Sequence, residues 1–251
     1  MTARLSSIIY TLIGAFPIKA SQIALPLSFD RQFSFENFFS QQGQLIIASL
    51  KTMIDGNGES IIGLWGASDS GKTHLLNACA YYARQQGISF QFYDAIELAQ
   101  YDADNFDDLE TCRVLAVDNL DALCGNQIWE EKFYQIINSC KNGHLNLIFT
   151  LSENPSYLEC RLADFQSRLS WGLLLHLHLT GETDIGRVIK LRAGLLGIDL
   201  SKEVIAYLLV HYSRQLSVQI EILRILDRAS LSAQKKITIP LIKQTLADYH
   251  P

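Results

Sequence analysis

Short apolar runs alternate with amphipathic stretches along the chain from about residue 60 onward. This alternation is typical of a parallel β-sheet covered by helices, because such strands are buried on both faces and read as nearly continuous apolar segments. The runs that predict strands are Ile61–Trp65, Ile88–Tyr93, Cys112–Val117, Leu145–Leu151 and Leu173–Leu179. The intervening stretches that predict helices are Thr73–Gln86, Ile128–Cys140 and a short segment within Tyr157–Leu169. The pattern therefore predicts an α/β domain with a five-stranded parallel sheet.

After Gly181 the pattern changes to helical periodicity alone. The segments with this spacing are Thr183–Leu196, Lys202–Tyr212, Val218–Ala233 and Ile239–Tyr249. Gly197 and Ser213 separate neighbouring segments, and Pro240 stands where proline favours the start of a helix. We therefore expect an α/β domain over residues 28–180 and a small all-helical domain over residues 181–251.

The N-terminal residues 1–21 are expected to be an extension ahead of the folded domains. Arg4 precedes an apolar run, Leu5 to Pro17, and Ala20 follows it, which faintly resembles a secretory signal peptide. We instead expect residues 1–21 to be an upstream extension of a cytoplasmic protein, because the motifs in the rest of the chain are typical of cytosolic proteins. Membrane association is not expected, because no segment reaches the roughly 18 apolar residues that a membrane span needs.

Composition and charge narrow the class of protein. The chain has 251 residues, of which 48% are hydrophobic, and a formal net charge of -5, which excludes a disordered or fibrous chain. Residues 1–180 carry 11 basic and 19 acidic side chains, whereas residues 181–251 carry 10 and 7. This balance disfavours a strongly basic duplex-DNA binder. The acidic run over residues 94–110 fits a solvated surface or a partner surface.

The cysteines give no sign of a disulfide framework or a metal site. There are five of them, with no Cys-x-x-Cys pair and no histidines at zinc-ligand spacing nearby. We therefore expect reduced and mostly buried thiols. The five are Cys79, Cys112, Cys124, Cys140 and Cys160.

A phosphate-binding motif follows the first predicted strand. Gly66-Ala-Ser-Asp-Ser70-Gly71-Lys72-Thr73 fits the pattern G-x-x-x-x-G-K-[ST] and opens a predicted helix. Glycines allow the backbone to curl so that its N–H groups face phosphate oxygens at the helix N-terminus. Lys72 can reach the β- and γ-phosphates, and the Thr73 hydroxyl can bind Mg²⁺. The motif predicts a site for ATP or ADP.

The sequence Val114-Leu-Ala-Val-Asp118-Asn119 supplies a second part of the same site. An apolar strand that ends in an aspartate places a carboxylate beside the phosphate loop, where it can hold the Mg²⁺ ion and its water shell. Asn119 follows directly, and its amide has no useful basicity to activate water. We therefore expect weak intrinsic hydrolysis.

Several motifs in order resemble those of DnaA-type AAA+ proteins. They are the segment Phe33-Ser-Phe-Glu-Asn-Phe38, the phosphate loop, Asp118-Asn119, Ser167-Arg168-Leu-Ser-Trp171-Gly172 and the helical C-terminal lid. The resemblance covers roughly residues 22 to 250. It is closest to the Hda family of regulators that inactivate the replication initiator DnaA, because the chain ends before an initiator's helix-turn-helix domain would begin. The stretch from Asp227 to Pro240 also looks like Hda.

The resemblance implies a clamp-binding peptide at residues 22–27. Gln22-Ile-Ala-Leu25-Pro26-Leu27 is similar to the Q-x-x-L-P-L peptide with which Hda binds the β sliding clamp of DNA polymerase III. Leu25 and Leu27 would fill an apolar groove, Pro26 would stiffen the segment, and Gln22 would enter a polar pocket. A packing strand at the N-terminus is the alternative for so short a motif. Contact with DNA would be indirect, through the clamp.

The resemblance also implies that Arg168 is an arginine finger, which acts on the nucleotide of a neighbouring subunit. A guanidinium is planar and always charged, so it can neutralise charge on a transferred phosphoryl group. A surface salt bridge is the alternative.

Two positions depart from the pattern of the family. Ser217 stands where the lid would carry its sensor arginine, and Ser152 stands where a polar or acidic sensor lies beside the γ-phosphate. ATP and ADP should then be distinguished poorly, unless Arg214 or Arg224 replaces the missing arginine. The resemblance implies a resident nucleotide that sets the shape of the protein, such as ADP.

The leading hypothesis is a regulator that binds nucleotide and the clamp, docks against ATP-loaded DnaA and triggers hydrolysis through Arg168, with homo-oligomers possible. An autonomous ATPase such as a DnaC-type helicase loader is the alternative, and Asn119 argues against it. A small-molecule kinase shares the phosphate loop but needs neither the clamp peptide nor the Ser167–Gly172 motif.

Overall fold

The computed structural model describes residues 33–40, 42–103, 106, 112–143, 145–178, 182–247 and 249. The expected N-terminal extension and the peptide over residues 22–27 lie outside the described residues.

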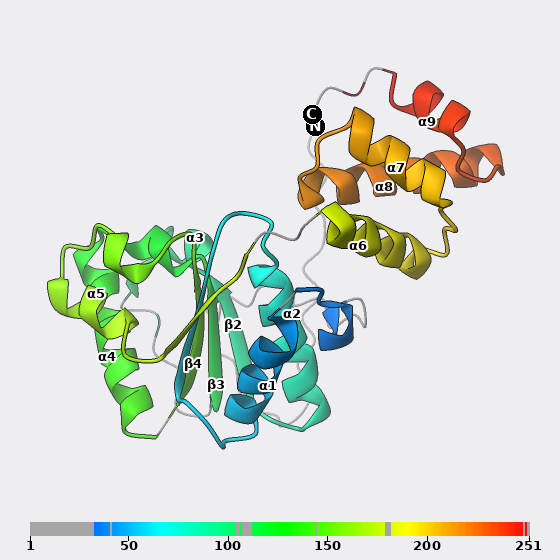
Figure 1. Ribbon diagram of the computed structural model, residues 1–251. Helices are drawn as coiled ribbons and strands as arrows, with labels where there is room; N and C mark the ends of the chain where they lie inside the picture. Colours follow the sequence, from blue (N-terminus) through cyan, green and yellow to red (C-terminus); the bar gives the residue numbers. More distant parts are fainter. Residues whose placement is uncertain are drawn as a thin grey trace, which may run out of the picture.

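A five-stranded parallel sheet forms the centre of the first domain (Figure 1). Its strands are β1 (Ile61–Trp65), β2 (Phe90–Asp94), β3 (Val114–Asp118), β4 (Asn146–Leu151) and β5 (Leu173–His176). Their order across the sheet is β2-β3-β4-β1-β5, and every pairing is parallel. The carboxyl ends of all the strands therefore meet at one edge, where ligands of open α/β sheets bind. The prediction of a five-stranded parallel sheet is confirmed.

Helices cover both faces of the sheet (Figure 1). On one face, α1 (Gly43–Ile54) and α2 (Lys72–Gln85) pack over the apolar side chains of β1, β3 and β4. On the other face lie α3 (Ala95–Leu98), α4 (Gln127–Lys141) and α5 (Ala163–Leu169), with α4 contributing Trp129 and Phe133 to the core. Short 3₁₀ turns within the described ranges connect these elements, among them η2 (Phe35–Asn37), η4 (Leu120–Leu123) and η5 (Pro155–Tyr157).

The short helix predicted within Tyr157–Leu169 is present as α5. It begins at Ala163, after η5 and an extended stretch. The backbone N–H groups of Arg161 and Leu162 donate to the Glu130 carboxylate, at 3.0 and 2.6 Å. A carboxylate of α4 therefore accepts the backbone N–H groups of this stretch. Local sequence periodicity gives no sign of such a contact, because Glu130 is distant in the chain.

Four helices form a second core after the sheet domain. They are α6 (Glu182–Leu195), α7 (Lys202–His211), α8 (Leu216–Ala233) and α9 (Ile239–Thr245). Buried apolar side chains such as Ile189, Leu208, Leu223 and Ile242 fill their centre. The prediction of a small helical lid after the α/β domain is confirmed. Within the described residues, none of these helices, nor any other, is both long and apolar enough to cross a bilayer.

Gly172 should be sensitive to the smallest enlargement, because a Cβ there would lie 2.2 Å from the carbonyl oxygen of Ile61 in β1. We expect Gly172→Ala to push β5 away from β1 and to lower the free energy of unfolding by about 1–3 kcal/mol. Gly194 in α6 has open space around its Cβ position, so Gly194→Ala should stabilise by about 0.5–1 kcal/mol. Urea denaturation measures both, and a Gly172→Ala protein as stable as wild type would contradict this packing.

Candidate nucleotide-binding site

The loop that follows β1 is curled by residues in the left-handed region of backbone space. Gly66, Asp69 and Gly71 have φ values of 154°, 62° and 94°. A Cβ on Gly66 would lie 2.3 Å from the Leu177 carbonyl oxygen, and one on Gly71 would lie 2.8 Å from the Phe38 ring. Both glycines are therefore required by conformation and by space. Gly71 caps α2, whose first N–H groups face outward for a phosphate.

Lys72, the first residue of α2, bends its side chain back over this loop. Its ammonium donates to the carbonyl oxygens of Gly66 and Ala67, at 2.6 and 2.9 Å. Burial lowers the pKa of Lys72, and the nearby carboxylates of Asp118, Asp121 and Asp69 oppose that shift. A cation lies at the mouth of a curled backbone, as phosphate binding requires.

Asp118 is the carboxylate at the end of β3, and it is only 3% exposed. The Thr73 hydroxyl donates to its Oδ2 at 2.6 Å, and the Thr150 hydroxyl donates to its Oδ1 at 2.5 Å. Burial raises the pKa of the Asp118 carboxyl, although these two hydrogen bonds and Lys72 oppose the rise. A hydroxyl and a carboxylate in contact beside a phosphate loop are the oxygen ligands that Mg²⁺ takes in such sites.

Asn119 holds two strand ends together. It adopts a left-handed conformation with φ of 55°, and its side-chain amide donates to Asp94 Oδ1 at the end of β2, at 3.1 Å. Its backbone N–H donates to the Thr150 hydroxyl at 2.8 Å. The position next to Asp118 is thus occupied by a structural amide.

Asp121 belongs to the site, although the sequence reasoning did not identify it. Both the hydroxyl and the backbone N–H of Ser152 donate to Asp121 Oδ2. Ser152 directly follows β4, so this pair lies at the same sheet edge as Asp118. The signal present in the sequence was its position: Asp121 lies in η4, three residues after Asp118 and next to the same strand end.

Two buried polar atoms at this edge have no hydrogen-bond partner among the described residues. They are Ser70 Oγ, in the loop, and Asp121 Oδ1. An unpaired buried oxygen is costly in free energy unless a ligand, an ion or a water molecule satisfies it. These atoms therefore fit a site shaped for a phosphate group and its cation.

The lid makes one polar contact with this loop and one with α2. The Ser217 hydroxyl, at the start of α8, donates to Asp69 Oδ2 at 3.0 Å. Arg192 of α6 lies 3.3 Å from His74 Nδ1 in α2, and His74 Nε2 lies 3.2 Å from the Ser34 carbonyl oxygen. Burial, helped by Arg192, lowers the pKa of His74 to about 4, so the ring is neutral at pH 7. It donates to Ser34 and accepts from Arg192.

Two lid arginines are candidates to replace the family's sensor arginine. Arg214 donates to the Leu209 carbonyl oxygen at 3.3 Å, within the lid, and Arg224 is exposed on α8. Ser217, at the expected position of that sensor arginine, has a neutral hydroxyl in contact with an acid of the loop.

Arg168 lies apart from the other candidate residues, near the end of α5. Its Nε donates to Asn138 Oδ1 and its Nη2 donates to the Tyr134 hydroxyl, both at 2.9 Å. The guanidinium carbon lies 3.9 Å from the centre of the Tyr134 ring and 4.3 Å from that of Trp171. Trp171 is 40% exposed. The guanidinium is thus fixed between two aromatic rings at the surface, and among the described residues no carboxylate pairs with it.

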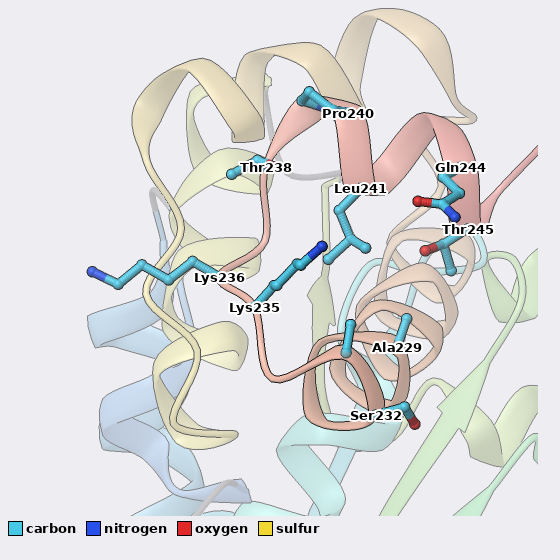
Figure 2. A pocket seen from close by; sticks show the side chains of 10 residues that line it. Ala229, Ser232, Lys235, Lys236, Thr238, Pro240, Leu241, Gln244 and Thr245 are labelled. Carbon is cyan, nitrogen blue, oxygen red and sulfur yellow. The ribbon is translucent and has the colours of Figure 1, made fainter.

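A separate hollow of about 820 Å³ lies in the lid, between the end of α8 and α9 (Figure 2). Figure 2 shows Lys235 extending toward Leu241, while Lys236 extends away from it. None of the lining residues comes from the phosphate loop or the sheet edge. This hollow has no part in the nucleotide site.

Two family models match the chain. Residues 29–176 match the model of the bacterial DnaA ATPase domain, and residues 182–246 match the model of the Hda lid domain. The predicted similarity to DnaA-related AAA+ proteins with an Hda-type lid is thereby confirmed.

Solved structures share the fold. Domain III of the replication initiation protein DnaA from Thermotoga maritima has a TM-score of 0.76 at 16% identity, over 88% of this chain and 98% of that one. AMPPCP-bound DnaA from Aquifex aeolicus has a TM-score of 0.68 at 20% identity, over 88% of this chain and 71% of that one. The RuvB Holliday junction branch migration motor of Thermotoga maritima has a TM-score of 0.67 at 16% identity, over 88% and 73%. At these identities the likeness concerns the fold alone.

The raised pKa of Asp118 means that the ionised carboxylate is destabilising in the folded protein without ligand. We expect Asp118→Asn to raise Tm at neutral pH, because the neutral amide avoids the cost of burying a charge. The gain should shrink as the pH falls through the raised pKa toward 3.8, the ordinary value of the group. Thermal unfolding at several pH values measures this difference. A lower Tm for Asp118→Asn at neutral pH would show that the two threonine hydrogen bonds outweigh burial.

Proposed function

The chain belongs to the bacterial DnaA ATPase domain family, and from this premise we propose that it regulates replication initiation by inactivating DnaA. In this proposal, the nucleotide-bound chain sits on the β sliding clamp and docks against ATP-loaded DnaA. Arg168 then enters the partner's nucleotide site and stimulates hydrolysis there. The Hda-type lid supports a regulator rather than an initiator.

The proposed resident ligand is ADP or ATP with Mg²⁺. Gly66, Gly71 and the start of α2 would hold the phosphates, with Lys72 as their counter-charge. The Thr73 hydroxyl and the Asp118 carboxylate, already 2.6 Å apart, would hold the cation. The AMPPCP-bound DnaA from Aquifex aeolicus supports an adenine nucleotide. The bound nucleotide would neutralise Lys72 and tie the loop to the lid.

The observation that carries the proposal is the environment of Arg168. Two hydrogen bonds and two aromatic rings hold its guanidinium in place. An arginine has five N–H donors. Within the described part of the chain, two of them are used, so the others can still bind phosphate oxygens. A preorganised guanidinium loses little conformational freedom on binding. It contacts α4 and Trp171 rather than the chain's own loop, which supports action on a neighbouring subunit.

One observation favours the second candidate, an autonomous ATPase such as a DnaC-type helicase loader. Asp121 and Ser152 are joined beside Lys72, and Asp121 keeps one oxygen free of partners among the described residues. A carboxylate in that position is a candidate to orient water for hydrolysis in the chain's own site. Steady-state ATPase assays of the chain alone and with DnaA and clamp distinguish the candidates, because only the regulator requires its partners.

Replacing Arg168 tests the proposed mechanism. We expect Arg168→Ala to reduce stimulated hydrolysis of DnaA-bound ATP by at least about tenfold, since arginine fingers contribute up to about 10³–10⁵ in rate. Arg168→Lys should restore little, because an ammonium cannot make the forked, planar contact. Nucleotide binding should remain intact, in contrast to a Lys72→Ala control. Hydrolysis is followed by release of labelled phosphate on clamp-loaded DNA. A folded Arg168→Ala protein that stimulates at the wild-type rate would refute the mechanism.

The clamp-binding peptide is tested separately. We expect replacement of Gln22, Leu25 and Leu27 by alanine, with Pro26 retained, to weaken clamp binding by at least about 100-fold, or about 2.7 kcal/mol. Tm should be unchanged if the peptide precedes the folded domain. Calorimetric titration with the purified clamp measures the affinity. Unchanged affinity would remove residues 22–27 from the proposal, and a large drop in Tm would favour the packing-strand alternative.

A further inference from the structure

Two thiols lie in contact on the sheet face that α4 and α5 cover. The Sγ atoms of Cys124 and Cys160 are 3.0 Å apart, although 36 positions separate the two residues in the sequence. Cys124 directly follows η4, and Cys160 lies in the extended stretch that leads into α5. A disulfide bond has a sulfur–sulfur distance of about 2.05 Å. A movement of about 1 Å would therefore bring the two sulfurs to bonding distance.

A buried carboxylate fixes both backbone segments that carry these thiols. Glu130 Oε1 accepts the N–H of Gly125 at 2.7 Å and the N–H of Arg161 at 3.0 Å. These two residues directly follow Cys124 and Cys160, and Glu130 itself is fully buried. Because one oxygen atom anchors both segments, bringing the thiols together requires little further loss of backbone entropy.

Cys124 and Cys160 differ from the other cysteines in their exposure to solvent. Cys79, Cys112 and Cys140 are buried, whereas Cys124 and Cys160 are partly exposed. Among the described residues, no group of three or more His, Cys, Asp or Glu side chains could hold a metal ion. The close approach of these two sulfurs is therefore not accounted for by a metal site.

We propose that Cys124 and Cys160 form a reversible disulfide bond by exchange with a low-molecular-weight disulfide such as oxidised glutathione. The thiolate of one cysteine attacks a glutathione sulfur, the glutathione S–S bond breaks, and one glutathione thiolate leaves and takes up a proton. The thiolate of the second cysteine then attacks the protein sulfur of this mixed disulfide and displaces the other glutathione. Two protein thiols are oxidised, and one glutathione disulfide is reduced to two thiols.

The bond would link the turn after β3 to the extended stretch that precedes α5. Arg168 lies on α5. It would close a loop that contains α4 and β4, and so restrict the unfolded chain. Burial raises the pKa of the Cys124 and Cys160 thiols. The exchange is therefore slow at neutral pH.

The test incubates the folded chain with oxidised glutathione for hours, unfolds it in denaturant, alkylates the remaining thiols and measures intact mass. We expect three of the five cysteines to be alkylated, with the loss of two hydrogen atoms and a cross-linked peptide joining residues 124 and 160. Tm should rise by roughly 5–10 °C, and a reducing agent should reverse the rise. Five alkylated cysteines after equilibration would overturn the proposal.

Matched variants separate this pair from other thiols. Cys124→Ser and Cys160→Ser should each lose the cross-link and collect a glutathione adduct on the remaining cysteine. Cys140→Ala should retain the cross-link, because Cys140 has no part in the pair. A cross-link that survives in Cys124→Ser would also overturn the proposal. If a variant fails to fold, the peptide map of the wild-type chain decides between a Cys124–Cys160 bond and any other pairing.

Discussion

The buried carboxylate of Asp118 is the constraint on which the candidate site depends. A charge that is 3% exposed is tolerated only with partners, and here the partners are the hydroxyls of Thr73 and Thr150. These threonines belong to α2 and β4, so one carboxylate fixes the phosphate loop and two neighbouring strands at the same edge. The hydrogen bonds do not fully offset the desolvation, since the pKa of Asp118 remains raised. The folded chain therefore retains a preference for a cation at this point.

Two contacts join the lid to this edge, and in each of them a charged group meets a neutral one. His74 is neutral and links the Phe33–Phe38 segment to Arg192 of the lid. Ser217 bonds to Asp69, an acid that occupies a left-handed position within the phosphate loop. A hydrogen bond with one charged partner is stronger than one between two neutral groups. These contacts therefore tie the lid to the helix and the loop that would hold the phosphates.

Arg168 and the phosphate loop occupy separate parts of the sheet domain. The loop follows β1 and leads into α2, whereas Arg168 lies on α5 and contacts α4. The guanidinium is held at the surface between Tyr134 and Trp171, and its partners among the described residues lie outside the chain's own nucleotide site. This separation fits the proposed division, in which one site binds a resident nucleotide and the other acts on a partner.

The sequence by itself determined the strands, most helices and the phosphate loop, because these depend on hydrophobic periodicity and on residues adjacent in the chain. It identified Gly66, Gly71, Lys72 and Asp118 for the same reason. Only the tertiary structure decided what Asp121 contacts, why α5 begins at Ala163, and that Cys124 meets Cys160. Each of these depends on a hydrogen bond or contact between residues about 30 or more positions apart. Local pattern carries no information about such pairs, since packing of the sheet and its helices brings them together.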